Sequence, residues 1–204
     1  MLCFQVHVQV GTHDRTNPEQ QIRVKSIALH PDWDGTGRIW KDLAILTLDH
    51  PVTFTDKIRP LCLPSDASLS YAGETATAAG WGVADDGYLP AKLRKVQMKV
   101  ISNEQCRWIN TSYDLCAFGE EDDFFGIRPG DSGTLLFLME NERSSGDIHK
   151  LLMKPFLFRY TGISVTSRTY DKYDIFTRIT PNIKTWIQSV ASGTQDSDVT
   201  CSSA

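Results

Sequence analysis

The sequence predicts an all-β fold, an antiparallel sandwich or barrel, with a single helix near the end of the chain. Short apolar runs rich in β-branched residues recur along the 204 residues, and clusters of Gly, Pro, Asp and Asn separate them. Many short strands at this spacing are typical of antiparallel sandwiches and barrels. A clear helical pattern occurs in one place only, and no internal repeat stands out.

Each predicted strand is a run of apolar and β-branched residues bounded by turn-forming residues. The polar segment Asn141–Lys150 lies between two such runs, and we expect it to be a surface hairpin loop. In chain order, the predicted strands are Gln5–Val10, Gln21–Ala28, Leu43–Leu48, Glu74–Gly80, Lys92–Val100, Thr134–Leu138, Leu157–Val165 and Asp174–Ile179.

The predicted helix begins after Thr180. The Thr180 side chain can cap it, and Pro181 suits the first turn because no backbone N–H is needed there. Ser192-Gly193 ends the helix, so we expect a folded domain over residues 1–193 and a polar, flexible tail over 194–204. The apolar side chains of one helix face are Ile183, Trp186, Ile187 and Val190.

The composition excludes several classes of partner. Of the 204 residues, 41% are hydrophobic and 23% are charged, which suits one globular unit or two small packed ones. With 21 basic and 25 acidic residues the net charge is -4, so no basic stripe for nucleic acid is expected. The apolar runs are too short to cross a bilayer. The acidic run 120–123 lacks spaced ligands and a glycine turn, so we expect neither a metal site nor a cofactor.

Cysteine content and a glycosylation motif favour an oxidising, secretory setting. The chain has five cysteines, and Asn110-Thr111-Ser112 is an acceptor sequence for N-glycosylation at Asn110. We therefore expect an extracellular protein. The start, Met1–Gln5, lacks the features of a signal peptide, so we expect further sequence upstream. The odd number of cysteines leaves at least one thiol free or paired outside the chain.

The segment Pro129-Gly130-Asp131-Ser132-Gly133 has the features that an exposed nucleophile needs. Glycines let the backbone turn sharply, and nearby N–H groups can then face a developing oxyanion. Upstream, Asp42 precedes a buried strand, where an acid can orient an imidazole.

Further motifs accompany this pair of segments in a fixed order. Together they resemble the trypsin/chymotrypsin family of serine proteases, especially its arthropod-type members with a regulatory segment, and the resemblance runs from about Val6 to Gly193. In chain order the motifs are Lys41–Leu48, Arg59–Pro64, Ala79–Gly82, Val100–Cys106, Leu115–Ala117, Pro129–Gly133 and Ile175–Ile179.

The resemblance implies two packed antiparallel β-barrels, the first of them incomplete, followed by the C-terminal helix. It assigns Ser132 as the nucleophile and Asp42 as the acid that orients the base. The N–H groups of Gly130 and Ser132 would form the oxyanion hole. Asp131 would be the buried carboxylate that pairs, in active relatives, with a new amino terminus released by proteolysis.

The general base of this family is missing from the expected place. Relatives carry a histidine inside Ala-Ala-His-Cys, a tetrapeptide that does not occur here. If Cys3 matches that cysteine, Leu2 occupies the histidine position, and leucine accepts no proton. We expect surface or structural roles for the histidines that are present: His7, His13, His30, His50 and His149.

The amino terminus also departs from the family. Active relatives begin with Ile-Val-Gly-Gly, whereas this chain begins Met1-Leu2-Cys3. Without that ammonium, we expect Asp131 to turn elsewhere or its loop to relax as in a zymogen, and the chain to be nearly inert. Two interpretations stay open: a fragment of an active serine endopeptidase, or a non-catalytic homologue with a binding or regulatory role.

For the primary specificity pocket, the resemblance points to Gly126, Ser167 and Asp174. Gly126 lies six residues before the nucleophile, where trypsin-like enzymes carry an acid. Asp174 occupies a pocket-wall position at which glycine is common, so it would supply the charge from the opposite side. We expect a pocket that accepts Arg or Lys side chains of a protein or peptide substrate. Ser164–Ser167 stands where relatives carry Val-Ser-Trp-Gly.

The resemblance also assigns some of the cysteines. Cys106 and Cys116 match a pair that staples a surface loop. Cys62 resembles the cysteine that tethers the catalytic domain to a regulatory segment, which would make that segment or another protease a partner. Cys3 and Cys201 have no assigned partner.

Overall fold

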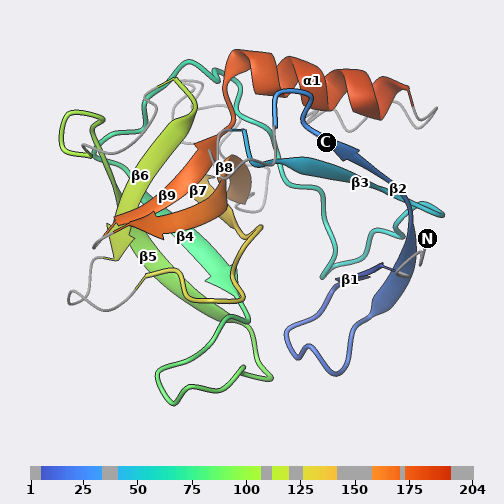
Figure 1. Cartoon of the computed structure of the whole chain (residues 1–204). Coiled ribbons are helices and arrows are strands. Elements are labelled where there is room, and N and C mark those ends of the chain that lie inside the picture. The colour runs from blue at the N-terminus through green and yellow to red at the C-terminus, as the bar shows by residue number, and fades with distance from the viewer. Residues whose placement is uncertain are drawn as a thin grey trace, which may run out of the picture.

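The computed structural model describes residues 6–33, 41–106, 112–119, 126–141, 158–170 and 173–193. These residues form a mostly β structure with two sheets and a C-terminal helix (Figure 1). The first sheet is antiparallel, in the order β1-β2-β3. Its strands are β1 (His7–Val10), β2 (Gln20–Leu29) and β3 (Ala44–Leu48).

The second sheet is a closed antiparallel barrel in the order β4-β5-β6-β9-β8-β7. Strand β4 pairs with both β5 and β7, which closes the barrel and leaves no open sheet edge. The barrel strands are β4 (Thr75–Gly80), β5 (Arg94–Ile101), β6 (Asp114–Gly119), β7 (Leu135–Asn141), β8 (Phe158–Tyr170) and β9 (Tyr173–Arg178).

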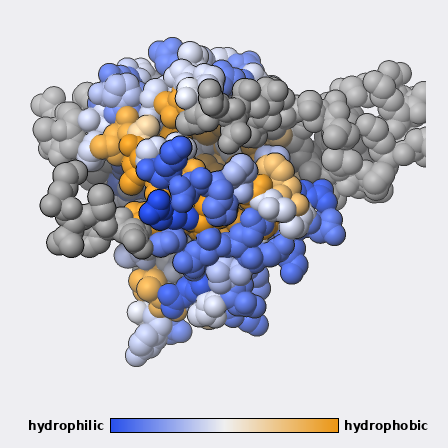
Figure 2. All heavy atoms as spheres, turned by 90° about the vertical axis from the view of Figure 1, so that its right-hand side faces the viewer, coloured by the Kyte–Doolittle hydropathy of each residue, from blue (hydrophilic) through white to orange (hydrophobic). Residues whose placement is uncertain are grey.

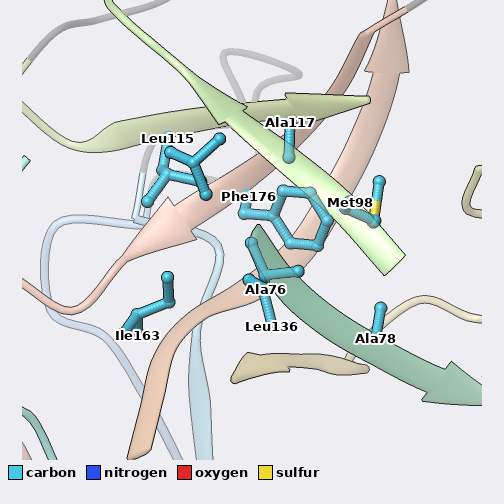
Figure 3. Close-up of a cluster of buried hydrophobic side chains, with 9 residues drawn as sticks. Ala76, Ala78, Met98, Leu115, Ala117, Leu136, Ile163 and Phe176 are labelled. Carbon is cyan, nitrogen blue, oxygen red and sulfur yellow. The ribbon is translucent and has the colours of Figure 1, made fainter. Parts of the chain in front are cut away.

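Apolar side chains from every barrel strand form the main core (Figure 3). Alternate residues of a strand point to opposite faces, so one set of each strand is buried. Phe176 is fully buried among small alanines and larger aliphatic side chains. The cluster consists of Ala76, Ala78, Met98, Val100, Leu115, Ala117, Leu136, Ile163 and Phe176.

The segment between the two sheets is fixed to β8. Cys62 forms a parallel bridge with Thr161, and its N–H and carbonyl groups bond to Tyr160 and Gly162 at 3.0 Å each. Gly162 permits this approach, since a Cβ there would lie 2.8 Å from the Leu61 side chain. The contact holds the first sheet beside the barrel.

The helix α1 (Pro181–Ser192) begins as predicted. Thr180 caps it by accepting a hydrogen bond from the Ile183 N–H, and Ile183 is buried. The Trp186 ring lies 4.7 Å from the ring of His30, which follows β2, so the helix also packs against the first sheet. No helix among the described residues is both long and apolar enough to span a bilayer.

The first sheet buries less of its apolar surface than the barrel does. Ile27 pairs with Leu46, and both side chains are exposed, as is Leu29. The molecular face on the side of this sheet is largely hydrophilic, with separate apolar patches (Figure 2). The described strands of the first sheet do not close into a barrel, whereas those of the second sheet do.

The structure confirms the all-β class and the terminal helix. Every predicted strand overlaps an observed one, whereas β6 was not predicted as a strand. The loop 142–150, the acidic run 120–123, the tail 194–204, Asn110 and the first five residues lie outside the described residues.

Candidate active site

A tight turn presents Ser132. Arg128, Pro129, Gly130 and Asp131 form it, and the Asp131 N–H donates to the Arg128 carbonyl at 2.9 Å. Gly130 has a φ of 98°. Proline in the second position and a positive φ in the third are the features of a type II turn, in which the third residue is glycine by necessity.

The turn leaves two backbone donors available beside an exposed hydroxyl. Within the described part of the chain, the N–H groups of Gly130 and Ser132 have no protein acceptor, and Ser132 is exposed. Unsatisfied N–H groups next to a nucleophile are suited to an oxyanion, which forms when a hydroxyl adds to a carbonyl carbon.

The Asp131 carboxylate anchors the turn to the end of β4. One oxygen accepts the Gly82 N–H at 2.8 Å, and the other accepts the Arg128 N–H at 3.1 Å. Both Gly80 and Gly82 lie against this carboxylate, since a Cβ on either would lie 2.0 or 2.4 Å from its oxygens. The Gly-Trp-Gly sequence therefore forms the notch that receives Asp131.

A cavity of about 270 Å³ adjoins the turn on the Asp131 side. Its walls come from β4, β5 and the segment before the nucleophile. They include Gly80, Gly82, Gly126, Ile127, Arg128 and Asp131.

Asp42, which precedes β3 of the first sheet, contacts Ser167 in β8 of the barrel. The Ser167 hydroxyl donates to the Asp42 carboxylate at 3.3 Å. Ser167 lies at an irregularity of β8, between Thr166 and Arg168, and such bulges redirect side chains. The Thr166 backbone bonds in turn to Thr134 at 2.8 Å and to Gly133 at 3.3 Å. The structure thus connects Asp42 with the loop that carries the nucleophile.

No described histidine forms a hydrogen bond with Asp42 or with Ser132. Ser167 is the side-chain partner of Asp42 among the described residues, and the Ser132 hydroxyl has none there. His30 is buried against Trp186, and its Nδ1 accepts the Asp32 N–H at 3.2 Å. Burial, and secondly the charge of nearby Lys41, hold the pKa of His30 below its ordinary value. His149 lies outside the described residues.

Asp174 and Gly126 lie in contact. A Cβ on Gly126 would lie 2.4 Å from Oδ2 of Asp174, which accepts the Ile127 N–H at 2.9 Å. Oδ1 accepts the Thr169 hydroxyl at 2.8 Å. Asp174 is 4% exposed, and this burial raises the pKa of its carboxyl despite both hydrogen bonds.

The described hydrogen bond of Ser167 is to Asp42, so its predicted place in the specificity pocket stays a prediction. Its hydroxyl contacts Asp42, and no hydrogen bond joins it to Asp174 or Gly126. The side chain that donates to Asp174 is that of Thr169. Sequence reasoning missed Thr169, and also the role of Gly82, although Ala79–Gly82 was among the motifs. The two glycines around Trp81 were the available signal.

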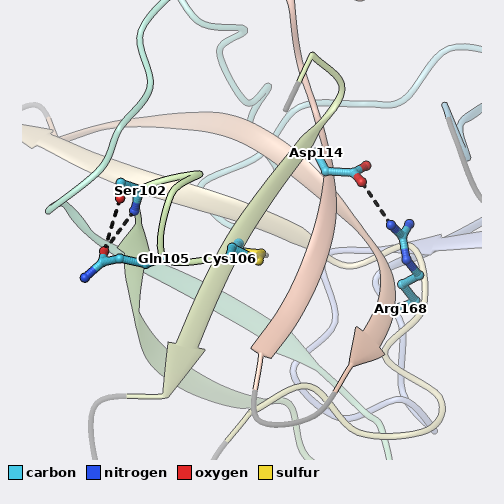
Figure 4. The surroundings of a disulfide bond; sticks show 6 residues. Ser102, Gln105, Cys106, Asp114 and Arg168 are labelled. Carbon is cyan, nitrogen blue, oxygen red and sulfur yellow. Dashed lines mark hydrogen bonds and ion pairs between the residues drawn. A yellow bond between two sulfur atoms is a disulfide. The ribbon is translucent and has the colours of Figure 1, made fainter. Parts of the chain in front are cut away.

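The disulfide between Cys106 and Cys116 forms, and it joins the turn after β5 to β6 (Figure 4). Cys62 is also disulfide-bonded. Among the described residues, no group of His, Cys, Asp or Glu side chains is arranged to hold a metal ion.

Comparisons of the sequence with known proteins give one family model and several relatives. The sequence model described as Trypsin matches residues 3–187. Serine proteinase stubble of Drosophila melanogaster is 31% identical over 113 residues, which cover 52% of this chain and 14% of that protein. Ovochymase-2 of Mus musculus is 29% identical over 109 residues, covering 52% and 18%. Ovochymase of Halocynthia roretzi is 29% identical over 113 residues, covering 53% and 7%. The matched region is thus less than a fifth of each relative.

Proposed function

This chain belongs to the trypsin family, and from that premise we propose that it is a serine-type endopeptidase domain in which Ser132 is the nucleophile. The observation that carries the proposal is the turn at Gly130, which leaves two N–H groups unsatisfied beside an exposed hydroxyl. Asp42 is the acid that would orient a base, and its place beside the same loop supports that role.

In the proposed reaction, the Ser132 oxygen adds to the carbonyl carbon of a peptide bond. The hydroxyl proton must leave as that bond forms, and the negative charge moves to the carbonyl oxygen. The N–H groups of Gly130 and Ser132 would stabilise this oxygen. A base then returns the proton to the leaving amine, and water later releases the acyl group.

The base is the part that the described residues do not supply. We propose that the 204-residue polypeptide by itself is nearly inert, because neither Ser132 nor Asp42 bonds to a described histidine. Loss of the histidine from a serine protease triad lowers kcat by about 10⁶-fold.

A non-catalytic homologue that binds proteins is the second candidate. The contact of Asp42 favours it, since Asp42 accepts a hydrogen bond from Ser167 in place of an imidazole. Gly133-Thr134-Leu135 also departs from the Gly-Gly-Pro or Gly-Ser-Pro of relatives. Such a protein would dock onto substrates or other proteases through the remaining cleft.

For the enzyme, we propose a protein or peptide substrate with an Arg or Lys side chain before the cleaved bond. Asp174 supports this, because its buried carboxylate lies beside Gly126, in the segment that leads to the nucleophile. The relative serine proteinase stubble is a proteinase by name, which supports a protein as the class of substrate.

We propose an extracellular setting, with a glycan on Asn110. We also propose that Asp131 is the carboxylate that responds to proteolytic activation. The cavity beside Asp131 supports the latter role. A regulatory segment or another protease tethered through Cys62 is also proposed. Cys62 is disulfide-bonded, and its bonding partner is the residue that a test of this tether must identify.

Chemical rescue tests the proposed chemistry. Ester hydrolysis by the 204-residue chain is measured with and without added imidazole, and Ser132→Ala is the control for hydrolysis by imidazole alone. Imidazole-dependent turnover that disappears in Ser132→Ala supports the endopeptidase assignment. If imidazole accelerates both proteins equally while peptide substrates still bind, the binding homologue is the better account.

A further inference from the structure

We propose that the dipeptide Tyr113-Asp114 positions the contact between Asp42 and Ser167, by holding the two residues that flank this contact in the chain. The importance of Asp42 rests on the proposed function, whereas the contacts around Asp42 and Ser167 are seen in the structure itself. Two separate contacts carry it, one to Lys41 and one to Arg168.

The first contact fixes the residue before Asp42. Lys41 has a φ of 54°, in the left-handed region that side chains other than glycine rarely adopt. Its ammonium bonds to the Asp32 carboxylate and lies 4.5 Å from the centre of the Tyr113 ring. A cation over the face of an aromatic ring is attracted by it. These contacts hold the Lys41 side chain, which is only 16% exposed, and with it the backbone that leads into Asp42.

The second contact fixes the residue after Ser167. The Arg168 guanidinium donates to the Asp114 carboxylate at 2.9 Å (Figure 4). The Asp114 side chain is 0% exposed and that of Arg168 is 21% exposed. A guanidinium is well suited to such a partly buried pair, because it is weakly hydrated and presents its donors in a rigid plane.

The Ser167 position depends on where Arg168 is held. The pairing of β8 with β9 is irregular between Thr166 and Arg168, so Ser167 is the extra residue. A strand is free to slip at such a place unless its neighbours are fixed. The Arg168 ion pair fixes one side of the bulge, and the backbone bonds of Thr166 fix the other.

Tyr113 and Asp114 are themselves held in the barrel. The Tyr113 carbonyl accepts the Arg178 N–H at 2.8 Å, and Asp114 pairs with Thr177 of β9. One rigid dipeptide therefore contacts both chain segments that meet at Asp42. Asp42 precedes β3 of the first sheet, and Ser167 lies in β8 of the barrel. The dipeptide therefore determines how Asp42 and Ser167 are placed relative to each other.

A thermodynamic cycle distinguishes this positioning role from a purely stabilising ion pair. The folding equilibrium constant is measured for the wild type, Ser167→Ala, Arg168→Met and the double variant. We expect Ser167→Ala to lower the constant about fivefold in the wild type, the effect of losing a typical hydrogen bond. In the Arg168→Met background the same change should have less than about a twofold effect, because the hydroxyl is already displaced.

Arg23 of β2 provides the matched control. It forms an ion pair with Asp49 that is more exposed, at 55% and 42%. The effect of Ser167→Ala should therefore stay about fivefold in the Arg23→Met background. Equal effects of Ser167→Ala in the wild type and in Arg168→Met would overturn the proposal.

A spectroscopic measurement covers the case in which Arg168→Met does not fold. The ¹³Cγ shift of Asp42 is compared between the wild type, Arg168→Lys, Arg23→Met and Tyr113→Leu. Arg168→Lys and Tyr113→Leu should move this resonance, and Arg23→Met should leave it in place. An unmoved Asp42 resonance in Arg168→Lys and Tyr113→Leu would overturn the proposal. Neither measurement needs turnover, so failure of the rescue experiment with imidazole leaves this result independent.

Discussion

The Asp131 carboxylate accepts a hydrogen bond from the Gly82 N–H at 2.8 Å, which ties the nucleophile turn to the end of β4. The bond exists because Gly82 has no side chain: a Cβ there would lie 2.4 Å from the carboxylate. From the sequence we expected Asp131 to turn to other partners or its loop to relax, and the first alternative is compatible with these contacts. Asp131 is satisfied by the two backbone donors, Gly82 and Arg128.

The first prediction follows from that contact. Gly82→Ala should destabilise the protein by about 1–3 kcal/mol, the usual cost of overpacking a buried site. Gly193→Ala is the control, because its Cβ would meet only ordinary contacts at 3.6 Å. Urea denaturation measures both, and equal stability of the two variants would show that Asp131 does not occupy the notch.

The second prediction concerns Asp174 and pH. Burial raises the pKa of this carboxyl in the folded state above its ordinary 3.8. The folded protein then binds the proton more tightly than the unfolded chain does, so stability from this group is complete below pH 3.8. It is lost as pH rises through the folded pKa. Asp174→Asn should flatten this part of the stability profile, and an unchanged profile would contradict the assignment.

The third prediction concerns charge in the pocket. Benzamidinium, a small planar cation, should bind the 204-residue chain, and Asp174→Asn should weaken its binding at least about tenfold, since one partner of a desolvated charge pair is lost. Asp49→Asn, which changes an exposed carboxylate that does not line the cavity, is the control. Isothermal titration calorimetry gives both affinities. Equal binding to both variants would remove Asp174 from the specificity pocket.

The fourth prediction concerns His30. Burial beside Trp186 lowers the pKa of its imidazole below the ordinary 6.5, so the folded state disfavours the proton. Stability should be complete above pH 6.5 and should fall as pH decreases towards the folded pKa. NMR titration of the His30 ring measures the shift, and His30→Phe should reduce the acid sensitivity. A His30 pKa above 6.5 would contradict the packing described.

The fifth prediction concerns the disulfide. Replacing Cys106 and Cys116 together by serine should lower stability by about 2–4 kcal/mol, because the bond restricts the unfolded chain. Thermal unfolding with and without reductant provides the comparison. Reductant also breaks the Cys62 bond, so it should destabilise the wild type by more than it destabilises the serine variant. Equal effects of reductant on the two proteins would contradict a stabilising role of the Cys106–Cys116 bond.

Local patterns were enough to predict much of this fold. The cap at Thr180, the proline after it and the apolar face of α1 are all encoded within a dozen residues. Strand β6 was not recognised because its first four residues, from Asp114 to Ala117, are all buried. A strand buried on both faces shows no alternation, and Asp, Ala and Gly are poor strand formers.

The site was predictable where a motif is contiguous and less so where the barrel assembles it. The turn before Ser132 follows from Pro129-Gly130 alone. The contact of Ser167 with Asp42 was not predicted, because the bulge that directs its side chain cannot be read from local sequence. The Arg168–Asp114 pair joins residues 54 positions apart, so only the fold brings it together.

The Ser132 hydroxyl has two backbone donors beside it, and no described histidine bonds to it. Labelling of the purified 204-residue chain by a fluorophosphonate probe measures this most directly. We predict no detectable labelling without added imidazole, and labelling confined to Ser132 when imidazole is present. Rapid labelling of Ser132 without imidazole, absent in Ser132→Ala, would contradict the account.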